Sequence, residues 1–316
     1  MNLDGTRVLV TGGAGVIARE LLSLLDVSGA SSLSVDRLPL PATPPASVEH
    51  LVGDLAAMDL DPIVDFAPTI ILHLAATFER SVESAEFWQP NWYDNVVVTH
   101  RLADLVARMG GVEAMVFASS YLVYRTSQYL SPTPRAEPVG LGEDAEIAPR
   151  NLCGAAKLYG EAELEFARGV MHGWARTVSA RIFRVYGRGS RDIVSRWVRA
   201  ALRGESIEVF NPENRFDYVY SGDVAEGLLR MAIEPEAIGP INLATGHTRT
   251  VGDVIAAIET ATGTSLRTTF VPSDEPFEAS RADVTRLRES LGWSPGTRLE
   301  DGVARLVAHE RENLHG

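Results

Sequence analysis

The chain has 316 residues, of which 45% are hydrophobic and 22% charged, and both fractions are ordinary for a folded globular protein. Its 29 basic and 42 acidic residues give a net charge of −13, which disfavours nonspecific nucleic-acid binding because polyphosphate is repelled. The single cysteine, Cys153, excludes an internal disulfide and a thiolate metal cluster, and the seven histidines show no metal-binding spacing. No apolar run approaches the ~20 residues that span a bilayer, and the first residues do not resemble a signal peptide. We therefore expect a cytoplasmic protein.

Strands alternate with helices along the first half of the chain. Apolar runs predict buried strands at 7–11, 33–36, 69–74, 114–118 and 178–183, and helical spacing predicts helices at 16–27, 95–109 and 153–169. This alternation predicts an α/β fold with a Rossmann-type, doubly wound parallel sheet that is covered on both faces. Four prolines within 39–45 predict one loop, and the Pro-, Ser- and Gly-rich stretch 125–150 predicts a longer, functional one.

The pattern becomes less regular after residue 182. Helices are expected near 192–203, 222–233, 251–261 and 299–312. We expect residues 1–182 to form the Rossmann domain and residues 183–316 to form mainly a smaller C-terminal α/β domain that binds substrate. Within the latter, about 213–244 is expected to pack back on the Rossmann domain.

A glycine-rich turn joins the first strand to the first helix, and its sequence is Thr-Gly-Gly-Ala-Gly-Val-Ile-Ala over residues 11–18. Glycines there let the backbone approach a pyrophosphate, and the helix N-terminus offers N–H groups with positive potential. Asp36 ends the second strand about 20 residues later, where a carboxylate accepts hydrogen bonds from both ribose hydroxyls. Asp36 would repel a 2′-phosphate, which favours NAD over NADP, whereas Arg37 beside it could accept that phosphate.

This turn resembles the extended short-chain dehydrogenase/reductase family, which contains nucleotide-sugar epimerases and dehydratases. Further segments resemble motifs of that family across nearly the whole chain: residues 53–55 (Gly-Asp-Leu), 73–76 (His-Leu-Ala-Ala), 95–99, 119–124 (Ser-Ser-Tyr-Leu-Val-Tyr), 242–246 and 291–295. Val98 stands where the family usually has glycine. The sugar dehydratases and glucuronate decarboxylases carry acidic residues at the positions of Tyr121 and Leu122, so the resemblance favours an epimerase, reductase or dehydrogenase.

The resemblance implies the following site. NAD contacts are expected from Gly12, Gly15, Val16, Ile17, Asp36, Arg37, Asp54, Leu55, Leu74, Ala75, Ala76, Asn95, Ala118, Lys157 and Phe183. Substrate contacts are expected from Thr77, Ser120, Arg184, Arg188 and Arg215. In the family, the lysine at the position of Lys157 binds the nicotinamide ribose, and the serine at the position of Ser120 holds the reacting oxygen.

Cys153 departs from the family at the catalytic position, because the usual motif Tyr-x-x-x-Lys reads Cys-x-x-x-Lys here. Cys153 and Lys157 share a helix face, and a thiol beside an ammonium is acidic enough to replace a phenol. Its reach, however, is shorter than that of a phenolic oxygen. Three alternatives follow: Cys153 acts through a water or on a deeper substrate, Tyr121 fills the gap, or the site does not perform full redox cycling.

The substrate side departs further. Arg184 replaces an asparagine that lies near the substrate phosphate in the family, and an arginine grips a phosphate or carboxylate bidentately. Arg215 lies one position early relative to the family's diphosphate arginine, and residues 273–275 lack a second one. The residues that bind the anionic group of the substrate are therefore expected to differ from those of the family, with Arg184 and Arg188 contributing.

We interpret the chain as an NAD-dependent enzyme that modifies a nucleotide-linked sugar through a transient keto intermediate. Two other interpretations stay open. The first is an NAD-binding protein without redox turnover, and the second is a dehydrogenase or epimerase of a carboxylated substrate without a nucleotide. The resemblance also implies a homodimer formed by the helices near 95–109 and 153–169. No metal, membrane or nucleic-acid partner is expected.

Overall fold

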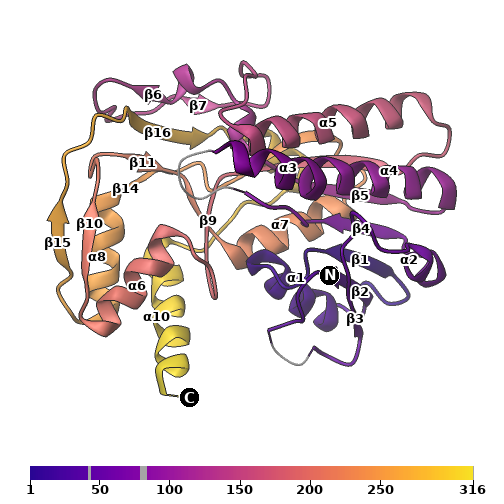
Figure 1. The fold of residues 1–316 in the computed structure, drawn as a ribbon, viewed down its shortest axis with the longest axis horizontal. Helices are drawn as coiled ribbons and strands as arrows, with labels where there is room; N and C mark the ends of the chain where they lie inside the picture. Colours follow the sequence, from indigo (N-terminus) through magenta and orange to yellow (C-terminus); the bar gives the residue numbers. More distant parts are fainter. Residues whose placement is uncertain (42–43, 79–83, 316) are drawn as a thin grey trace.

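The computed structural model describes residues 1–41, 44–78 and 84–315, and it contains a seven-stranded parallel sheet in the order β13-β8-β5-β4-β1-β2-β3 (Figure 1). The strands are β1 (Arg7–Thr11), β2 (Ser31–Asp36), β3 (Val48–Val52), β4 (Ile70–His73), β5 (Ala114–Ser120), β8 (Arg176–Ile182) and β13 (Gly239–Leu243). Strands β1, β4 and β5 are rich in apolar residues because both of their faces are covered. The predicted Rossmann-type fold is confirmed.

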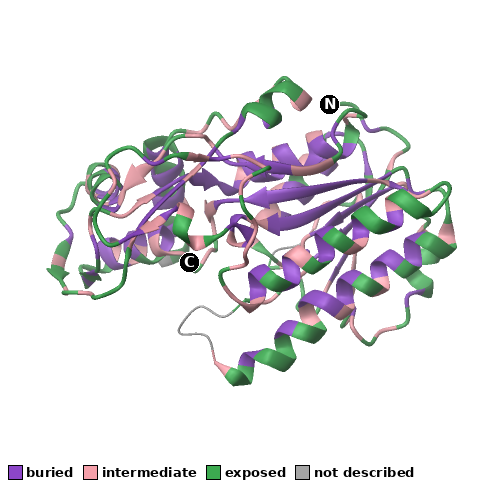
Figure 2. Ribbon diagram, turned by 90° about the horizontal axis from the view of Figure 1, so that it is seen from above, coloured by how far each residue is buried: buried purple, intermediate pink, exposed green. Residues whose placement is uncertain are grey.

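Helices cover both faces of this sheet. One face carries α1 (Val16–Val27) and α7 (Ser221–Ile233), and the other carries α2 (Asp61–Phe66), α4 (Val98–Met109) and α5 (Leu152–Val170). Side chains of β1 alternate between the two layers: Val8 and Val10 pack with α1 and α7, whereas Leu9 packs with α4 and α5. Figure 2 shows buried strands between helices that are exposed mainly on their outward sides.

A smaller unit lies beside the sheet, at the left of Figure 1. Its core is formed by α6 (Ile193–Arg203), α8 (Val251–Thr262) and α10 (Leu299–His315). Its short strands are β6 (Leu130–Ser131), β7 (Gly140–Leu141), β9 (Arg184–Tyr186), β10 (Ser206–Val209), β11 (Arg215–Phe216), β12 (Tyr218–Tyr220), β14 (Arg249–Thr250), β15 (Arg267–Phe270) and β16 (Phe277–Ala282). Short helical segments complete the description: Ala85–Phe87, α3 (Trp88–Asn91), Tyr121–Val123, Thr126–Gln128 and α9 (Thr285–Leu291).

The chain crosses between the two units more than once. From residues 213–244, α7 packs on α1, and β13 pairs with β8 at the edge of the main sheet. In the other direction, β6 and β7 pair with β16, so the stretch predicted as the long loop 125–150 contributes two short strands to the smaller unit. Segments from both units therefore meet where β5 ends.

One helix begins earlier than its predicted start at residue 95. Helical backbone runs from Trp88, and Trp92–Val97 forms a π-helical turn that leads into α4. Pro90 lies in the first turn of this earlier helical stretch. Proline is tolerated there because its missing N–H is not needed for a helical hydrogen bond. The π-turn places Asp94 and Asn95 next to the carboxyl ends of the strands, and such turns are frequent at functional sites.

Candidate active site

The glycine-rich turn brings the ends of β1 and β4 together. Gly12 has φ +75°, and a Cβ there would lie 2.7 Å from the backbone nitrogen of Ala75. Gly15 precedes α1, whose first N–H groups receive no side-chain cap. Val16 and Ile17 form the first positions of that helix. The turn thus presents N–H groups and helix-dipole potential to an anion, as the sequence predicts.

A cavity of about 160 Å³ opens beside this turn. Nine predicted cofactor residues line it: Gly12, Gly15, Asp36, Arg37, Asp54, Leu55, Leu74, Ala75 and Ala76. Asp36 accepts hydrogen bonds from the backbone N–H of Ala14 (3.0 Å) and of Leu38 (2.9 Å). These contacts hold the Asp36 carboxylate in place while leaving further lone pairs for ribose hydroxyls.

Arg37 is held by a carboxylate that the sequence analysis did not identify. Its guanidinium donates to both oxygens of Asp94, at 3.0 and 2.9 Å, and both residues line the cavity. The two lie 57 residues apart, so no local signal predicted this pair. The arginine that could have accepted a 2′-phosphate is therefore neutralised, and Asp36 adds a second carboxylate at the same end.

His73 supports the loop that follows β4. Thr99 donates to the carbonyl of Asn95 (2.7 Å), so His73 must donate through Nε2 to Thr99 (3.0 Å) and accept at Nδ1 from Thr11 (2.7 Å). Thr11 Oγ1 in turn accepts from the N–H groups of residues 74 and 75. Burial, followed by the nearby Lys157 charge, lowers the pKa of His73 to about 3, so it is a neutral structural group.

Asn95 fixes the position of Thr77, which was predicted to contact substrate. Its side-chain amide accepts from the Thr77 N–H and donates to the Thr77 carbonyl, both at 2.8 Å. Asn95 is 3% exposed and also donates to Asn91. Its side chain therefore joins the loop that borders the cavity to α3.

Ser120, Cys153 and Lys157 lie at the end of β5 and in the first turns of α5. Ser120 accepts a hydrogen bond from the Leu122 N–H. Cys153 and Lys157 are buried, and Lys157 Nζ lies 4.6 Å from the ring centroid of Phe117. Burial lowers the pKa of Lys157, and the opposing effect of Cys153 and Glu161 does not cancel it. The structure thus gives the predicted lysine a buried site beside the thiol.

Glu161 lies on the same face of α5 as Cys153 and Lys157, and it was not among the predicted site residues. Its carboxylate accepts three hydrogen bonds from Arg181, at 3.0, 3.3 and 2.8 Å, and a fourth from Ser119. Both members of the ion pair are almost fully buried. This pair ties α5 to β8 one helical turn after Lys157.

Tyr121 turns its phenol toward the smaller unit. The hydroxyl donates to Glu278 Oε1 (3.0 Å), and the ring stacks on Phe183 with centroids 5.0 Å apart. Burial raises the pKa of Tyr121 far above its usual range, although the Arg184 charge opposes this. The phenol that was one candidate for proton transfer is therefore a protonated group engaged with Glu278.

The predicted substrate arginines diverge. Arg184 donates to Glu278 (3.2 Å) beside Tyr121, whereas Arg188 makes a two-pronged contact with Glu20 of α1, at 2.9 and 2.6 Å. Arg215 lies on β11, next to β16. Of the three arginines, only Arg184 contacts the Tyr121 segment. Two predicted cofactor residues also lie near Tyr121: Ala118 is buried in β5, and Phe183 is buried just after β8.

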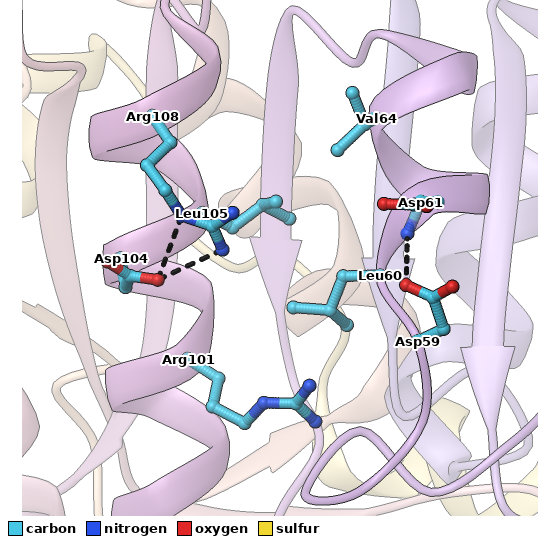
Figure 3. Close-up of a pocket in the computed structure, with 8 residues that line it drawn as sticks. All are labelled: Asp59, Leu60, Asp61, Val64, Arg101, Asp104, Leu105 and Arg108. Carbon is cyan, nitrogen blue, oxygen red and sulfur yellow. Dashed lines mark hydrogen bonds and ion pairs between the residues drawn. The ribbon is translucent and has the colours of Figure 1, made fainter.

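A second cavity, of about 140 Å³, lies between α2 and α4 (Figure 3). Arg101 at its edge donates to the carbonyls of Leu55 and Met58 and so supports the turn that lines the first cavity. Within the described ranges, no group of three or more His, Cys, Asp or Glu side chains is placed to hold a metal ion. No described helix is long and apolar enough to cross a membrane.

These observations define a Rossmann-type protein with a cavity beside its glycine-rich turn, a half-buried Ser120 at the end of β5 and a buried Lys157 on α5. The sequence model of the NAD dependent epimerase/dehydratase family matches residues 8–244. The chain belongs to this family and is an NAD-dependent enzyme.

Individual relatives agree over nearly the full chain. A UDP-glucose 4-epimerase from Mycolicibacterium smegmatis is 30% identical over 95% of this chain and 97% of its own length. UDP-glucuronic acid decarboxylase 2 from Arabidopsis thaliana is 26% identical over 99% of this chain and 70% of its own. The solved structure of MoeE5 in complex with UDP-glucose and NAD is 30% identical, with a TM-score of 0.83 over 98% of this chain and 99% of MoeE5.

Proposed function

We propose that this enzyme epimerises or oxidises a nucleotide-linked sugar through a transient keto intermediate. The observation that carries the proposal is that Ser120 ends β5 and that Lys157 of α5 lies over Phe117 of the same strand, in the parallel sheet whose β1 and β2 ends carry Gly12 and Asp36 at the cavity. The names of the relatives support the substrate class, because all three proteins bind or act on UDP-sugars. Tyr121 and Leu122 replace the acidic residues of the decarboxylases, which favours epimerase chemistry.

The residues present fit NAD. The uncapped start of α1 suits its diphosphate, and Asp36, with lone pairs to spare, suits its adenosine ribose. When bound, NAD would supply hydride acceptance from a secondary carbinol carbon and hydride return. The hydroxyl proton must leave as the carbonyl forms, and it must come back when the hydride returns to either face.

Three side chains perform the proton and orientation work in this proposal. Ser120 hydrogen-bonds the reacting oxygen, and Lys157 orients the nicotinamide ribose and favours an anionic neighbour. Cys153 takes the proton, directly from a deeply bound hydroxyl or through one water, since the Tyr121 phenol is engaged by Glu278. A thiolate beside an ammonium is a competent proton acceptor at neutral pH.

The test is product analysis with NAD-loaded protein. UDP-sugars are incubated with the wild type, Lys157→Ala and Cys153→Ala, and epimers are resolved by NMR. We expect turnover by the wild type and losses of about 100-fold or more in both variants, the range typical of general acid–base groups. Intact turnover in Lys157→Ala would refute the assignment. Retained NAD without any product or absorbance change would favour a binding protein without redox turnover.

We also infer a cytoplasmic homodimer that uses α4 and α5. Tyr159, Phe166 and Val170 form an exposed apolar stripe along α5, and Phe166 is 69% exposed. Trp92 adds another exposed aromatic at the neighbouring π-turn. Light scattering should give twice the chain mass for the wild type, and Phe166→Glu should shift the mass toward the monomer.

A further inference from the structure

A cluster of charged groups from both units lies next to Ser120. At its centre is Glu278, whose carboxylate is 5% exposed. Its Oε1 accepts from Tyr121 (3.0 Å) and Ser280 (3.1 Å), and its Oε2 accepts from Arg150 (2.6 Å) and Arg184 (3.2 Å). We call Tyr121, Arg150, Arg184 and Glu278 the Glu278 cluster.

The Glu278 cluster carries one positive charge. Burial opposes ionisation of Glu278, but the charges of Arg184 and Arg150 outweigh it and the net pKa of the carboxyl lies below its usual value. Tyr121 stays protonated because burial raises its pKa. Two guanidiniums therefore share a single carboxylate, and one charge has no counterion within the cluster.

Both guanidiniums keep donors that Glu278 does not use. The Arg184 side chain is 41% exposed and that of Arg150 is 34% exposed, and each directs one nitrogen at Glu278. Arg184 lies over the ring of Phe216, with 4.3 Å from its guanidinium carbon to the centroid. Its Nε is buried and has no hydrogen-bond partner among the residues that the structure describes. A guanidinium that lies over an aromatic ring keeps donors at its edge for a planar anion.

The position of the cluster points to the sugar end of the substrate. Tyr121 directly follows Ser120, and Arg150 precedes Asn151, which caps the helix that carries Cys153 and Lys157. An anion on these two arginines would therefore lie on the side of the reacting sugar. A carboxylate matches a guanidinium edge with two parallel hydrogen bonds.

We propose that Arg150 and Arg184 bind a carboxylate carried by the sugar, so that the substrate is a nucleotide-linked uronic acid. This inference rests on the proposed function, which leaves the sugar open. Glu278 acts as a positioning residue that orients both arginines and lowers the net charge of the cluster without abolishing it. Tyr121 links that cluster to the segment of Ser120.

Calorimetry on NAD-loaded protein tests the proposal with UDP, UDP-glucose and UDP-glucuronate. The wild type should bind UDP-glucuronate about 10- to 100-fold more tightly than UDP-glucose, the range of one or two charge-assisted hydrogen bonds. Arg184→Gln should remove that preference and leave UDP affinity unchanged. Arg196→Gln, which removes an exposed charge on α6, is the matched control and should keep the preference.

A second variant tests the proposal in case Arg184→Gln does not fold. Glu278→Gln keeps an acceptor for Tyr121 and frees both guanidiniums, so UDP-glucuronate binding should persist or tighten while UDP-glucose binding is unchanged. Equal affinity of the wild type for UDP-glucose and UDP-glucuronate would overturn the proposal. An equal loss of affinity for UDP and UDP-glucuronate in Arg184→Gln would also overturn it, and would mean that the cluster binds the diphosphate.

The nucleotide can be tested separately. If UDP alone does not bind, the nucleotide part of the proposed function is wrong, and free glucuronate then decides about the carboxylate. Thermal stabilisation by glucuronate but not by glucose, lost in Arg184→Gln, would still support the cluster as a carboxylate site. No stabilisation by glucuronate would refute it.

Discussion

Acidification should lower the free energy of unfolding of this protein through His73. His73 is fully buried, and its pKa falls from 6.5 to about 3 on folding. Between these values the unfolded chain binds one more proton than the native state, so the free energy of unfolding falls as the pH falls. The loss is about 1.36 kcal/mol per pH unit below 6.5, which gives about 2 kcal/mol between pH 7.5 and 5.0. A total stability of about 5–15 kcal/mol makes that loss large.

Urea unfolding at pH 7.5 and 5.0, at equal NAD occupancy, isolates this contribution. His73→Gln keeps a donor and an acceptor for the two threonine hydroxyls but does not titrate. It should be less stable at pH 7.5 and should lose about 2 kcal/mol less than the wild type on acidification. His172→Gln, at an exposed position, serves as the control for removing a histidine. Equal losses in the wild type and His73→Gln would refute the assignment of a neutral, buried imidazole.

Three further variants probe the cofactor and catalytic sites. Asp94→Asn should free Arg37 and raise NADPH affinity relative to NADH by about tenfold, because one ion pair with a phosphate is gained; fluorescence titration measures this, and an unchanged ratio would argue against the pair as a determinant. Cys153→Tyr should raise kcat by about tenfold or more if the short reach of the thiol limits proton transfer, and a lower kcat in folded, NAD-loaded protein would contradict that view. Glu161→Gln should cost about 3–5 kcal/mol of stability, seen as a lower Tm, because Arg181 is left charged and buried; an unchanged Tm would show that the pair is not a structural requirement.

Local signals predicted the Rossmann domain well. Strands β1, β4 and β5 are mainly apolar runs of four to seven residues, and the turn at residues 12–15 needs glycine because the end of β4 approaches it closely. The smaller unit was harder to predict, because strands such as β11 and β14 have two residues each and no alternation to detect. Strand β3 was missed as well, since His50 and Glu49 interrupt its apolar pattern.

The candidate site was predictable only where its residues belong to one local motif. The cavity beside the glycine-rich turn gathers nine residues that the turn and strand-end motifs indicate. Glu278, by contrast, lies 157 residues from Tyr121 and 128 from Arg150. Partners at such separations are set by the packing of β16 against the first unit, which no spacing rule encodes. For the same reason, the pairing of Arg188 with Glu20, 168 residues away, carries no signal in the sequence.

Two arginine–glutamate groups flank the proposed catalytic residues, and their differences in charge and exposure favour one of them as a ligand site. The Arg181–Glu161 pair is neutral overall, and its side chains are 5% and 7% exposed. Further hydrogen bonds with Ser119, Tyr124 and the Glu143 carbonyl complete its partners, and the pair ties α5 to β8, so it supports the helix that carries Lys157 without a substrate. The Glu278 cluster holds one arginine more than its carboxylate can neutralise, and both arginine side chains are partly exposed. One arginine is enough to offset the free-energy cost of burying the Glu278 charge. The other arginine is therefore best explained by an anionic group of the substrate, which would balance its charge on binding.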